Sequence, residues 1–160
     1  MPAPSPARPV ADSRVVMTEI VMPEDSNHFG DIFGGRVLAL VDKAGAIAAI
    51  RHARREVVTA SIDSIDFLSP VKEGYILTLL SEVRAVFRSS MEVAVEVLAE
   101  NPLTGERRTT CTAFLTLVAL DEHRKPVAVP ALEFTSDEER RHAAQAADRR
   151  SARLQRIASR

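Results

Sequence analysis

The chain has 160 residues, of which 46% are hydrophobic and 27% charged, and its formal net charge is -1. This composition is ordinary for one globular domain with a buried core, and near-neutrality gives no electrostatic reason to expect nucleic acid or an anionic membrane as a partner. Only 4% of the residues are aromatic and none is Trp, which argues against stacking platforms for single-stranded nucleic acid.

The first segment, residues 1–13, has four prolines among its first nine residues and no apolar signal core. We therefore expect a disordered leader, and neither a signal peptide nor a membrane anchor. The single cysteine, Cys111, lies in a strand-like run and cannot form an intrachain disulfide, so we interpret it as a packing residue. A reducing compartment is compatible with one free thiol, and we expect a cytoplasmic protein.

A short strand over residues 15–22 leads into the most informative stretch, residues 27–52, which reads N-H-F-G-D-I-F-G-G-R-V-L-A-L-V-D-K-A-G-A-I-A-A-I-R-H. The pattern predicts a glycine-rich turn and then a helix over about 35–52 that is apolar almost all round, with one carboxylate, Asp42, inside it. None of the residues three or four positions away can pair with that charge. Two interpretations stay open: a wetted edge position, or a catalytic acid or base.

The region after this helix predicts an antiparallel sheet. Its strands are expected over residues 57–67, 76–87, 90–100 and 107–120. The third has the clearest alternation, with apolar residues on one face and Glu92, Glu96 and Glu100 on the other, which predicts one packed and one partly solvated face. A single sheet wrapped around the helix leaves strand edges open, and a dimer joined edge to edge would cover them.

Residues 133–160 predict a helical tail, with Thr135 or Ser136 as its cap. Residues 135–160 contain 7 Arg and 4 acidic residues, a net charge of +3, so the rest of the chain has a net charge of -4. The apolar stripe of this helix is sparse. We interpret it as a solvated helix, with an anion or partner contact as the alternative.

The run N-x-x-G-x-x-F-G-G, followed by a helix that carries Asp42, resembles the acyl-CoA hydrolase branch of the hotdog-fold thioesterases. The runs V-V-T-A-S-I-D-S-I-D-F-L-S-P-V, R-S-S-M-E-V and F-L-T-L-V-A-L-D continue the resemblance in the same order, so that it covers about residues 15–132. One position departs from it: the family usually has Gly before R-S-S, and this chain has Phe87.

The resemblance implies an α+β hotdog fold, an antiparallel sheet wrapped around one long central helix, for a domain over residues 14–132. It also implies hydrolysis of acyl-CoA to the free acid and CoA, with no metal and no cofactor beyond the CoA of the substrate. The site is then expected at the interface of a homodimer, often within a hexamer built as a trimer of dimers. In such enzymes the helix acid and the loop amide come from different subunits, which assigns these roles to Asp42 and Asn27.

The residues themselves suit this chemistry. Backbone amides at a helix N-terminus are free to donate, and Gly34 and Gly35 would let a thioester oxygen approach them as an oxyanion hole. Asp42 can then act as general base or as nucleophile, and the sequence leaves both open. For the CoA phosphates, the best candidates are a guanidinium and two hydroxyls in sequence, with one lysine as a weaker candidate. They are Arg88, Ser89, Ser90 and Lys72.

Two other functions are compatible with the same fold. A hotdog hydratase or dehydratase is disfavoured because no proline follows His28-Phe29 and the helix has Asp42 in place of a glutamate. A non-catalytic acyl-CoA-binding or sensor protein is the other alternative, and it would bind acyl-CoA without releasing free thiol. The four histidines have no ligand-like spacing, so we expect no metal site.

Overall fold

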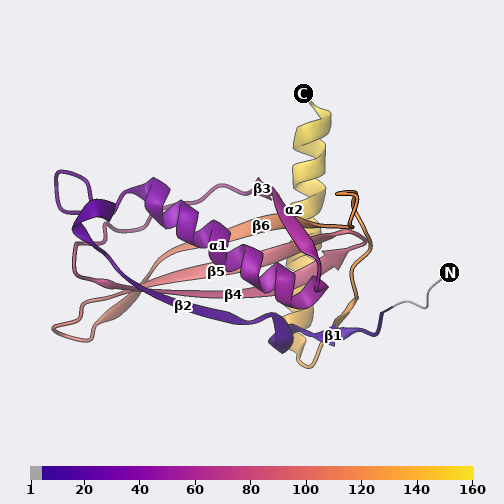
Figure 1. The fold of residues 1–160 in the computed structure, drawn as a ribbon, viewed down its shortest axis with the longest axis horizontal. Coiled ribbons are helices and arrows are strands. Elements are labelled where there is room, and N and C mark those ends of the chain that lie inside the picture. Colours follow the sequence, from indigo (N-terminus) through magenta and orange to yellow (C-terminus); the bar gives the residue numbers. More distant parts are fainter. Residues whose placement is uncertain (1–4) are drawn as a thin grey trace.

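A five-stranded antiparallel sheet in the order β2-β4-β5-β6-β3 forms the body of the protein in the computed structural model, which describes residues 5–160 (Figure 1). Its strands are β2 (Val15–Ile20), β3 (Glu56–Ile62), β4 (Ile76–Phe87), β5 (Ser90–Glu100) and β6 (Arg107–Leu120). Helix α1 (Gly34–Ala53) and helix α2 (Asp137–Ala158) both contact this sheet. In the part of the chain that the structure describes, no helix is long and apolar enough to span a membrane.

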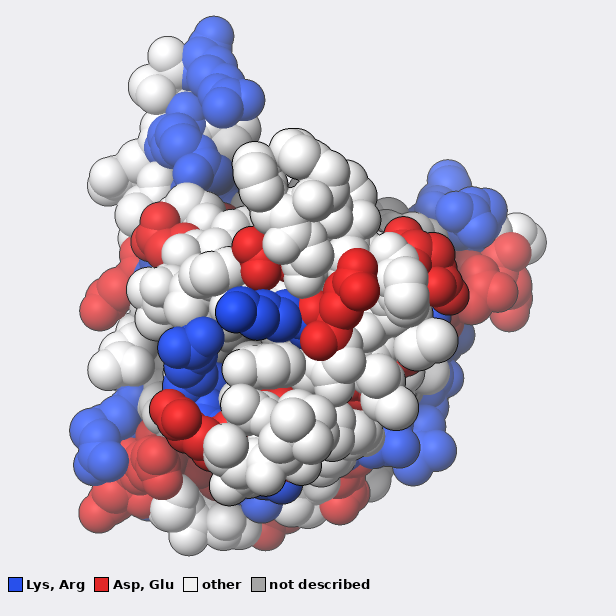
Figure 2. Space-filling model, turned by 90° about the vertical axis from the view of Figure 1, so that its left-hand side faces the viewer, with Lys and Arg blue, Asp and Glu red and all other residues white. Residues whose placement is uncertain are grey.

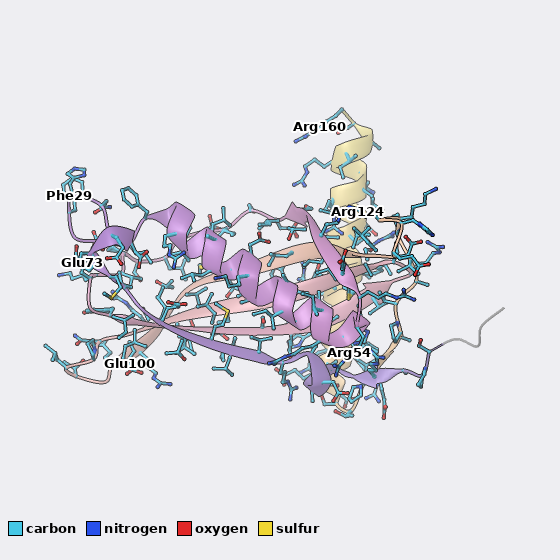
Figure 3. The ribbon with its side chains drawn as sticks, in the orientation of Figure 1. Phe29, Arg54, Glu73, Glu100, Arg124 and Arg160 are labelled. Carbon is cyan, nitrogen blue, oxygen red and sulfur yellow. The ribbon has the colours of Figure 1, made fainter. Side chains whose placement is uncertain are left out.

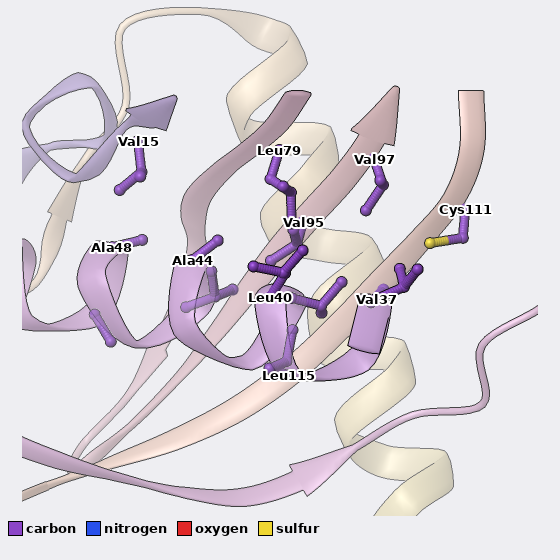
Figure 4. Packing of buried hydrophobic residues seen from close by; sticks show 14 of the residues in the cluster. Val15, Val37, Leu40, Ala44, Ala48, Leu79, Val95, Val97, Cys111 and Leu115 are labelled. Carbon is purple, nitrogen blue, oxygen red and sulfur yellow. The ribbon is translucent and has the colours of Figure 1, made fainter. Parts of the chain in front are cut away.

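The core lies between α1 and the concave face of the sheet (Figure 4). One side of α1 presents Val37, Leu40, Ala44 and Ala48 to apolar side chains of β4, β5 and β6, and all of these residues are buried. A Cβ atom added at Gly45 would lie only 3.2 Å from a methyl group of Leu115, so a glycine there lets α1 approach β6 closely. The expected sheet around a central helix is therefore observed.

The other side of α1 is uncovered in the protomer. Leu38 is 38% exposed and Ile50 is 45% exposed, and Asp42 on the same side is half-buried. A helix that is apolar nearly all round is expected to be buried nearly all round. The sheet of one copy covers only half of it, which agrees with the expectation that a second surface is needed.

Strand β3 is shorter than the predicted 57–67 and ends at Ile62. Beyond it, the chain follows β6 irregularly and returns for single backbone bonds, from Asp63 N to Phe114 O and from Leu68 N to Thr110 O. Within β3 the register shifts between Thr59 and Ser61, which marks a β-bulge. The bulge keeps Thr59 and Ile62 on the same face of the sheet, opposite the buried Leu117 and Leu115.

Helix α2 crosses the convex face of the sheet, where Arg149 pairs with Glu92 of β5, so the interpretation of the tail as a solvated helix is wrong for this part of it. Strand alternation puts Glu92 on this face, opposite to its buried neighbour Val93. Glu92 was expected on a partly solvated face, but it is only 1% exposed because α2 covers it and Arg149 pairs with it. The N-cap of α2 is Ser136, whose side chain accepts from Glu139 N. The tail helix therefore packs on the sheet through the ion pair of Arg149 with Glu92, although its apolar stripe is sparse.

The segment near the N-terminus pairs with the segment that precedes α2, beside the C-terminal end of α1 (Figure 1). Strand β1 (Arg8–Pro9) pairs in parallel with β7 (Leu132–Glu133), and a 3-10 turn (η1, Val10–Ser13) buries Val10 and Ser13. The first four residues lie outside the described part, but residues 8–13 are ordered, in contrast to the expected disordered leader of 1–13. The reason is burial of Val10 together with the backbone pairing to residues far along the chain.

Candidate active site

The N-terminus of α1 offers unpaired backbone donors. Its N-cap, Phe33, makes no side-chain cap, and the Phe33 carbonyl accepts from the amides of Arg36 and Val37. Among the described residues no acceptor is found for the amides of Gly34 and Gly35, and a Cβ added at Gly35 would meet nothing within 4 Å. The ring of Phe67 lies beside Gly34, 3.4 Å from where its Cβ would be, while the space beside Gly35 is open. The partial positive charge of the helix end adds to both donors.

A hollow of about 440 Å³ opens beside these amides. It is lined by Gly34, Gly35, Leu38, Ile62, Asp63, Ile65 and Phe67. A second hollow of about 300 Å³ lies on the other side of Phe67 and shares Gly34 with the first. Most of the lining side chains are apolar, so the helix N-terminus faces space suited to the apolar part of a ligand.

Asp42 lies on the uncovered side of α1 and is held by β3. Its Oδ1 accepts a hydrogen bond of 2.6 Å from the hydroxyl of Thr59. Thr59 pairs with the buried Leu117 of β6, which puts its side chain on the face of the sheet that meets α1. The carboxylate therefore has a fixed orientation and one oxygen without a partner among the described residues. Sequence reasoning missed Thr59, because a threonine in a strand is ordinary and only the folded chain brings it to Asp42.

Asn27 is a turn residue in the protomer. Its Oδ1 accepts from the backbone amides of Phe29 at 2.9 Å and Asp31 at 3.2 Å. The side-chain NH₂ group has no acceptor among the described residues, so it is available as a donor. No contact joins Asn27 to Asp42 within the described part of one copy, so the protomer alone does not bring this predicted pair together.

The residues predicted to hold the CoA phosphates do not meet within one protomer. Arg88 and Ser89 form the tight turn between β4 and β5, and Ser90 begins β5, whereas Lys72 precedes β4. The 12 residues of β4 separate the two groups, and a strand of that length spans about 40 Å. Figure 3 shows Glu73, the neighbour of Lys72 in the sequence, at the end of the molecule opposite Arg54 and Arg124.

Two further positions raised by the sequence have plain structural roles. His28 lies in an exposed loop with its ring 4.0 Å from that of Phe29. Phe87, which departs from the family pattern, lies under the Arg150 guanidinium of α2, 4.9 Å from its ring centroid. The ring therefore packs with the tail helix, far along the sheet from Gly34.

A curled sheet around one long helix is a hotdog fold. This one has free amides at the helix N-terminus and an aspartate further along that is held by Thr59. The family model of the thioesterase superfamily matches residues 29–106. The acyl-CoA thioester hydrolase YkhA of Bacillus subtilis, described as uncharacterized, is 47% identical over 128 residues, which are 80% of this chain and 74% of that protein. The chain belongs to the acyl-CoA thioester hydrolase family. The expected fold and family are confirmed.

Solved structures agree over almost the whole chain. A hexameric acyl-CoA thioesterase in its apo form is 47% identical with a TM-score of 0.92, covering 98% of this chain and 100% of that one. The acyl-CoA hydrolase of Staphylococcus aureus, solved with butyryl-CoA, CoA and CoA disulfide, is 37% identical with a TM-score of 0.88, covering 96% and 94%. By contrast, the chain spans only 26% of the acetyl-coenzyme A thioesterase of Mus musculus, to which it is 31% identical.

Proposed function

We propose that the protein hydrolyses acyl-CoA thioesters to a carboxylic acid and CoA, at a site shared between two copies of the chain. In this proposal the amides of Gly34 and Gly35 bind the thioester oxygen, and Asp42 of the other copy supplies the reacting carboxylate. Asn27 lies on the same copy as the glycines. Its free NH₂ group donates to the attacking water or to the thioester oxygen.

One observation carries the division between two copies. Asp42 follows Gly35 by seven residues on one straight helix, and a rise of 1.5 Å per residue puts them about 10 Å apart along the axis. A reacting group must come within about 3.5 Å of the carbonyl carbon. This separation between the amides and the carboxylate of one α1 supports a site in which the complementary group comes from a partner.

The protomer has the surface that such a partner needs. The outer edge of β3 has no strand paired to it among the described residues, and Val58 on this strand is 39% exposed. Leu38 and Ile50 on the neighbouring side of α1 are also uncovered. We propose a homodimer in which two β3 edges pair, because an open apolar edge otherwise invites non-specific pairing. The hexamer of the similar solved thioesterase supports a further assembly of such dimers.

The chemistry follows from these groups. As a general base, Asp42 takes a proton from water while the water oxygen attacks the thioester carbon, and the Gly34 and Gly35 amides stabilise the resulting oxyanion. The carbonyl re-forms as the C–S bond breaks, and the thiolate leaves and takes up a proton. As a nucleophile, Asp42 would first form a mixed anhydride, which water then hydrolyses. Thr59 holds the carboxylate in the orientation that either route needs.

The Staphylococcus aureus enzyme supports the choice of residues. Structures exist of its variants in which one asparagine, one aspartate or one threonine is changed to alanine. Those three residues are separated by 15 and 17 positions in its chain. Asn27, Asp42 and Thr59 are the same residue types with the same separations.

Release of free thiol from a panel of short- to long-chain acyl-CoAs tests the activity. Asp42→Asn should lower kcat by about 100-fold or more, because it removes the base and nucleophile while retaining an acceptor for Thr59. A wild-type protein that releases no thiol from any member of the panel contradicts the proposal. Consumption of an enoyl-CoA without thiol release would instead indicate a hydratase.

Co-expression of two inactive variants tests the shared site. Asp42→Ala and Asn27→Ala each damage both sites of a homodimer, but a mixed dimer keeps one site with both residues intact. Random pairing should restore up to about a quarter of the wild-type activity, since half of the dimers are mixed and half of their sites are intact. Activity that stays at the level of the separate variants would place both residues in one protomer's site.

A further inference from the structure

A basic hollow of about 460 Å³ lies where the C-terminal half of α2 passes the end of β3. Three arginines of α2 line it together with Phe114 of β6 and two residues that follow β3. These residues are Arg149, Arg153, Arg156, Phe114, Asp63 and Ser64. Figure 2 shows Lys and Arg side chains gathered on the part of the molecule that rises at the top, where Figure 1 places the end of α2.

Arg149 lines this hollow and is held in one position by its contacts. Its guanidinium makes three hydrogen bonds of 2.6 to 3.2 Å to the carboxylate of Glu92, which is 1% exposed. The same guanidinium lies 3.7 Å from the centroid of the Phe114 ring. The pair to Glu92 offsets its charge, while the ring and the carboxylate fix its position, so no ordering is needed when a ligand arrives.

The other two arginines have unused hydrogen-bonding capacity. Arg153 is only 7% exposed, yet its Nη1 has no hydrogen-bond acceptor. The Oδ1 atom of Asp63 is 3.8 Å from it, too far for a hydrogen bond. Arg156 is exposed and forms no ion pair with any residue from 5 to 160. Three guanidinium groups face two carboxylates here, which leaves one net positive charge.

We propose that this hollow binds a phosphate group of a small ligand. A guanidinium presents a planar fork of donors that matches phosphate oxygens, and the Ser64 hydroxyl adds a neutral donor beside it. The carboxylate of Asp63 is the one repulsive group in the lining, and it is already drawn towards Arg153. In this proposal the arginines of α2 bind the ligand, and its phosphate oxygens accept from Arg153 Nη1, which has no acceptor within the described residues.

Two sources could supply the phosphate. Asp63 also lines the hollow beside Gly34 and Gly35, so the basic hollow adjoins the proposed thioester site. The phosphates of an acyl-CoA are the first source, and this assignment rests on the proposed function. A free nucleotide or inorganic phosphate is the second source, and it would make the hollow a separate site on the same enzyme.

Calorimetric titration of the full chain with CoA, ADP and sodium phosphate, at one fixed low ionic strength, tests the proposal. Arg156→Ala should weaken binding of at least one of the three by about tenfold or more, the effect of losing one charge-assisted hydrogen bond. The matched control is Arg160→Ala, which removes the same charge just beyond the C-terminal end of α2 and outside the hollow. It should change the affinity by no more than about twofold, as expected for a screened surface charge.

The variants also separate the two sources. If Arg156→Ala weakens CoA binding and raises KM for acyl-CoA at unchanged kcat, the phosphate belongs to the substrate. If it weakens ADP or phosphate binding while KM is unchanged, the hollow is a separate phosphate site. The proposal is overturned if none of the three ligands binds, or if Arg156→Ala and Arg160→Ala have the same effect. Because binding is measured without turnover, a failure of the thioesterase proposal would not alter this result.

Discussion

The two faces of the sheet are stabilised in different ways. On the concave face, α1 packs small and branched apolar side chains against β4, β5 and β6, close enough that Gly45 approaches Leu115. On the convex face, α2 is more polar and is held by the buried pair of Glu92 and Arg149. Apolar packing is non-directional and stabilises the fold in proportion to the buried area. A buried ion pair stabilises the fold only while both partners are present.

This difference separates stability from function. The packed side of α1 holds the fold together, and its uncovered side carries Asp42, whose carboxylate accepts from Thr59. On the convex face, the ion pair of Arg149 and Glu92 attaches α2 to a part of the sheet that would otherwise be exposed to solvent. The further arginines of α2 line the basic hollow. Substitutions on the two faces should therefore behave differently, and four of them test the contrast by their effect on the free energy of unfolding.

Leu115→Ala should have the largest effect. This side chain is fully buried between α1 and β6, and large-to-small changes at such sites lower the free energy of unfolding by about 2–5 kcal/mol. Chemical denaturation followed by circular dichroism measures it. A loss below about 1 kcal/mol would mean that the concave core can collapse around the cavity, contrary to the tight packing described.

Arg149→Met should lower the free energy of unfolding by about 2–3 kcal/mol, because it leaves the buried Glu92 carboxylate without a partner. This loss is small for a buried pair because the Arg149 side chain is 26% exposed, so water already screens part of the interaction. The double variant Glu92→Leu with Arg149→Met should recover most of the loss, since an apolar pair of similar volume replaces the ion pair. A double variant less stable than Arg149→Met alone would contradict this account of the convex face.

Acidification should weaken the protein through His52. Burial lowers the pKa of this side chain from 6.5, Arg8 lowers it further, and the Pro130 carbonyl that accepts from Nε2 opposes the shift. Between these two pKa values the unfolded chain binds a proton at His52 and the folded chain does not. The contribution of the neutral His52 to the free energy of unfolding is therefore complete above pH 6.5, and it falls as the pH drops towards the lowered pKa. One such proton changes the free energy of unfolding by at most about 1.4 kcal/mol per pH unit.

Thermal unfolding between pH 7.5 and 5.5 measures this loss. The neutral ring donates from Nε2 and leaves Nδ1 buried without a partner, so protonation would place a charge where no acceptor is found. His52→Gln should flatten the pH dependence in that interval, because an amide does not titrate. An equally steep profile in the variant would assign the effect to other groups.

Asp42→Asn should have the smallest effect on stability, within about 0.5 kcal/mol, because its side chain is half-buried and the amide oxygen still accepts from Thr59. A melting temperature close to that of the wild type, combined with the loss of kcat, would show that Asp42 serves function and not stability. A large loss of stability would make Asp42 a structural residue.

Much of the fold could be predicted from periodicity. The strands at 76–87, 90–100 and 107–120 match the prediction, since alternation over 11 to 14 residues leaves little choice of register. Strand β3 was predicted too long because its apolar run continues after pairing becomes irregular beyond Ile62. Residues 8–13 are ordered because strand β1 pairs with residues 132–133, and no local sequence pattern predicts a contact so far along the chain.

Less of the candidate site could be predicted. The helix N-terminus at Gly34-Gly35 and the isolated Asp42 are local features, and the sequence alone indicated them. The hydrogen bond from Thr59 to Asp42 depends on the pairing of β3 with β6 and on contact across 17 residues, and the basic hollow depends on where α2 crosses the sheet. The expected CoA-binding group was assembled from two segments that lie at opposite ends of β4.

The sequence by itself therefore determined the order of elements, the central helix and its lone carboxylate, because these depend on residue types a few positions apart. Only the tertiary structure decided which side of α1 stays open, what holds Asp42, and that the convex face is covered through Glu92. Those properties arise from contacts between residues tens of positions apart, where the free energy of burial and pairing depends on the path of the whole chain.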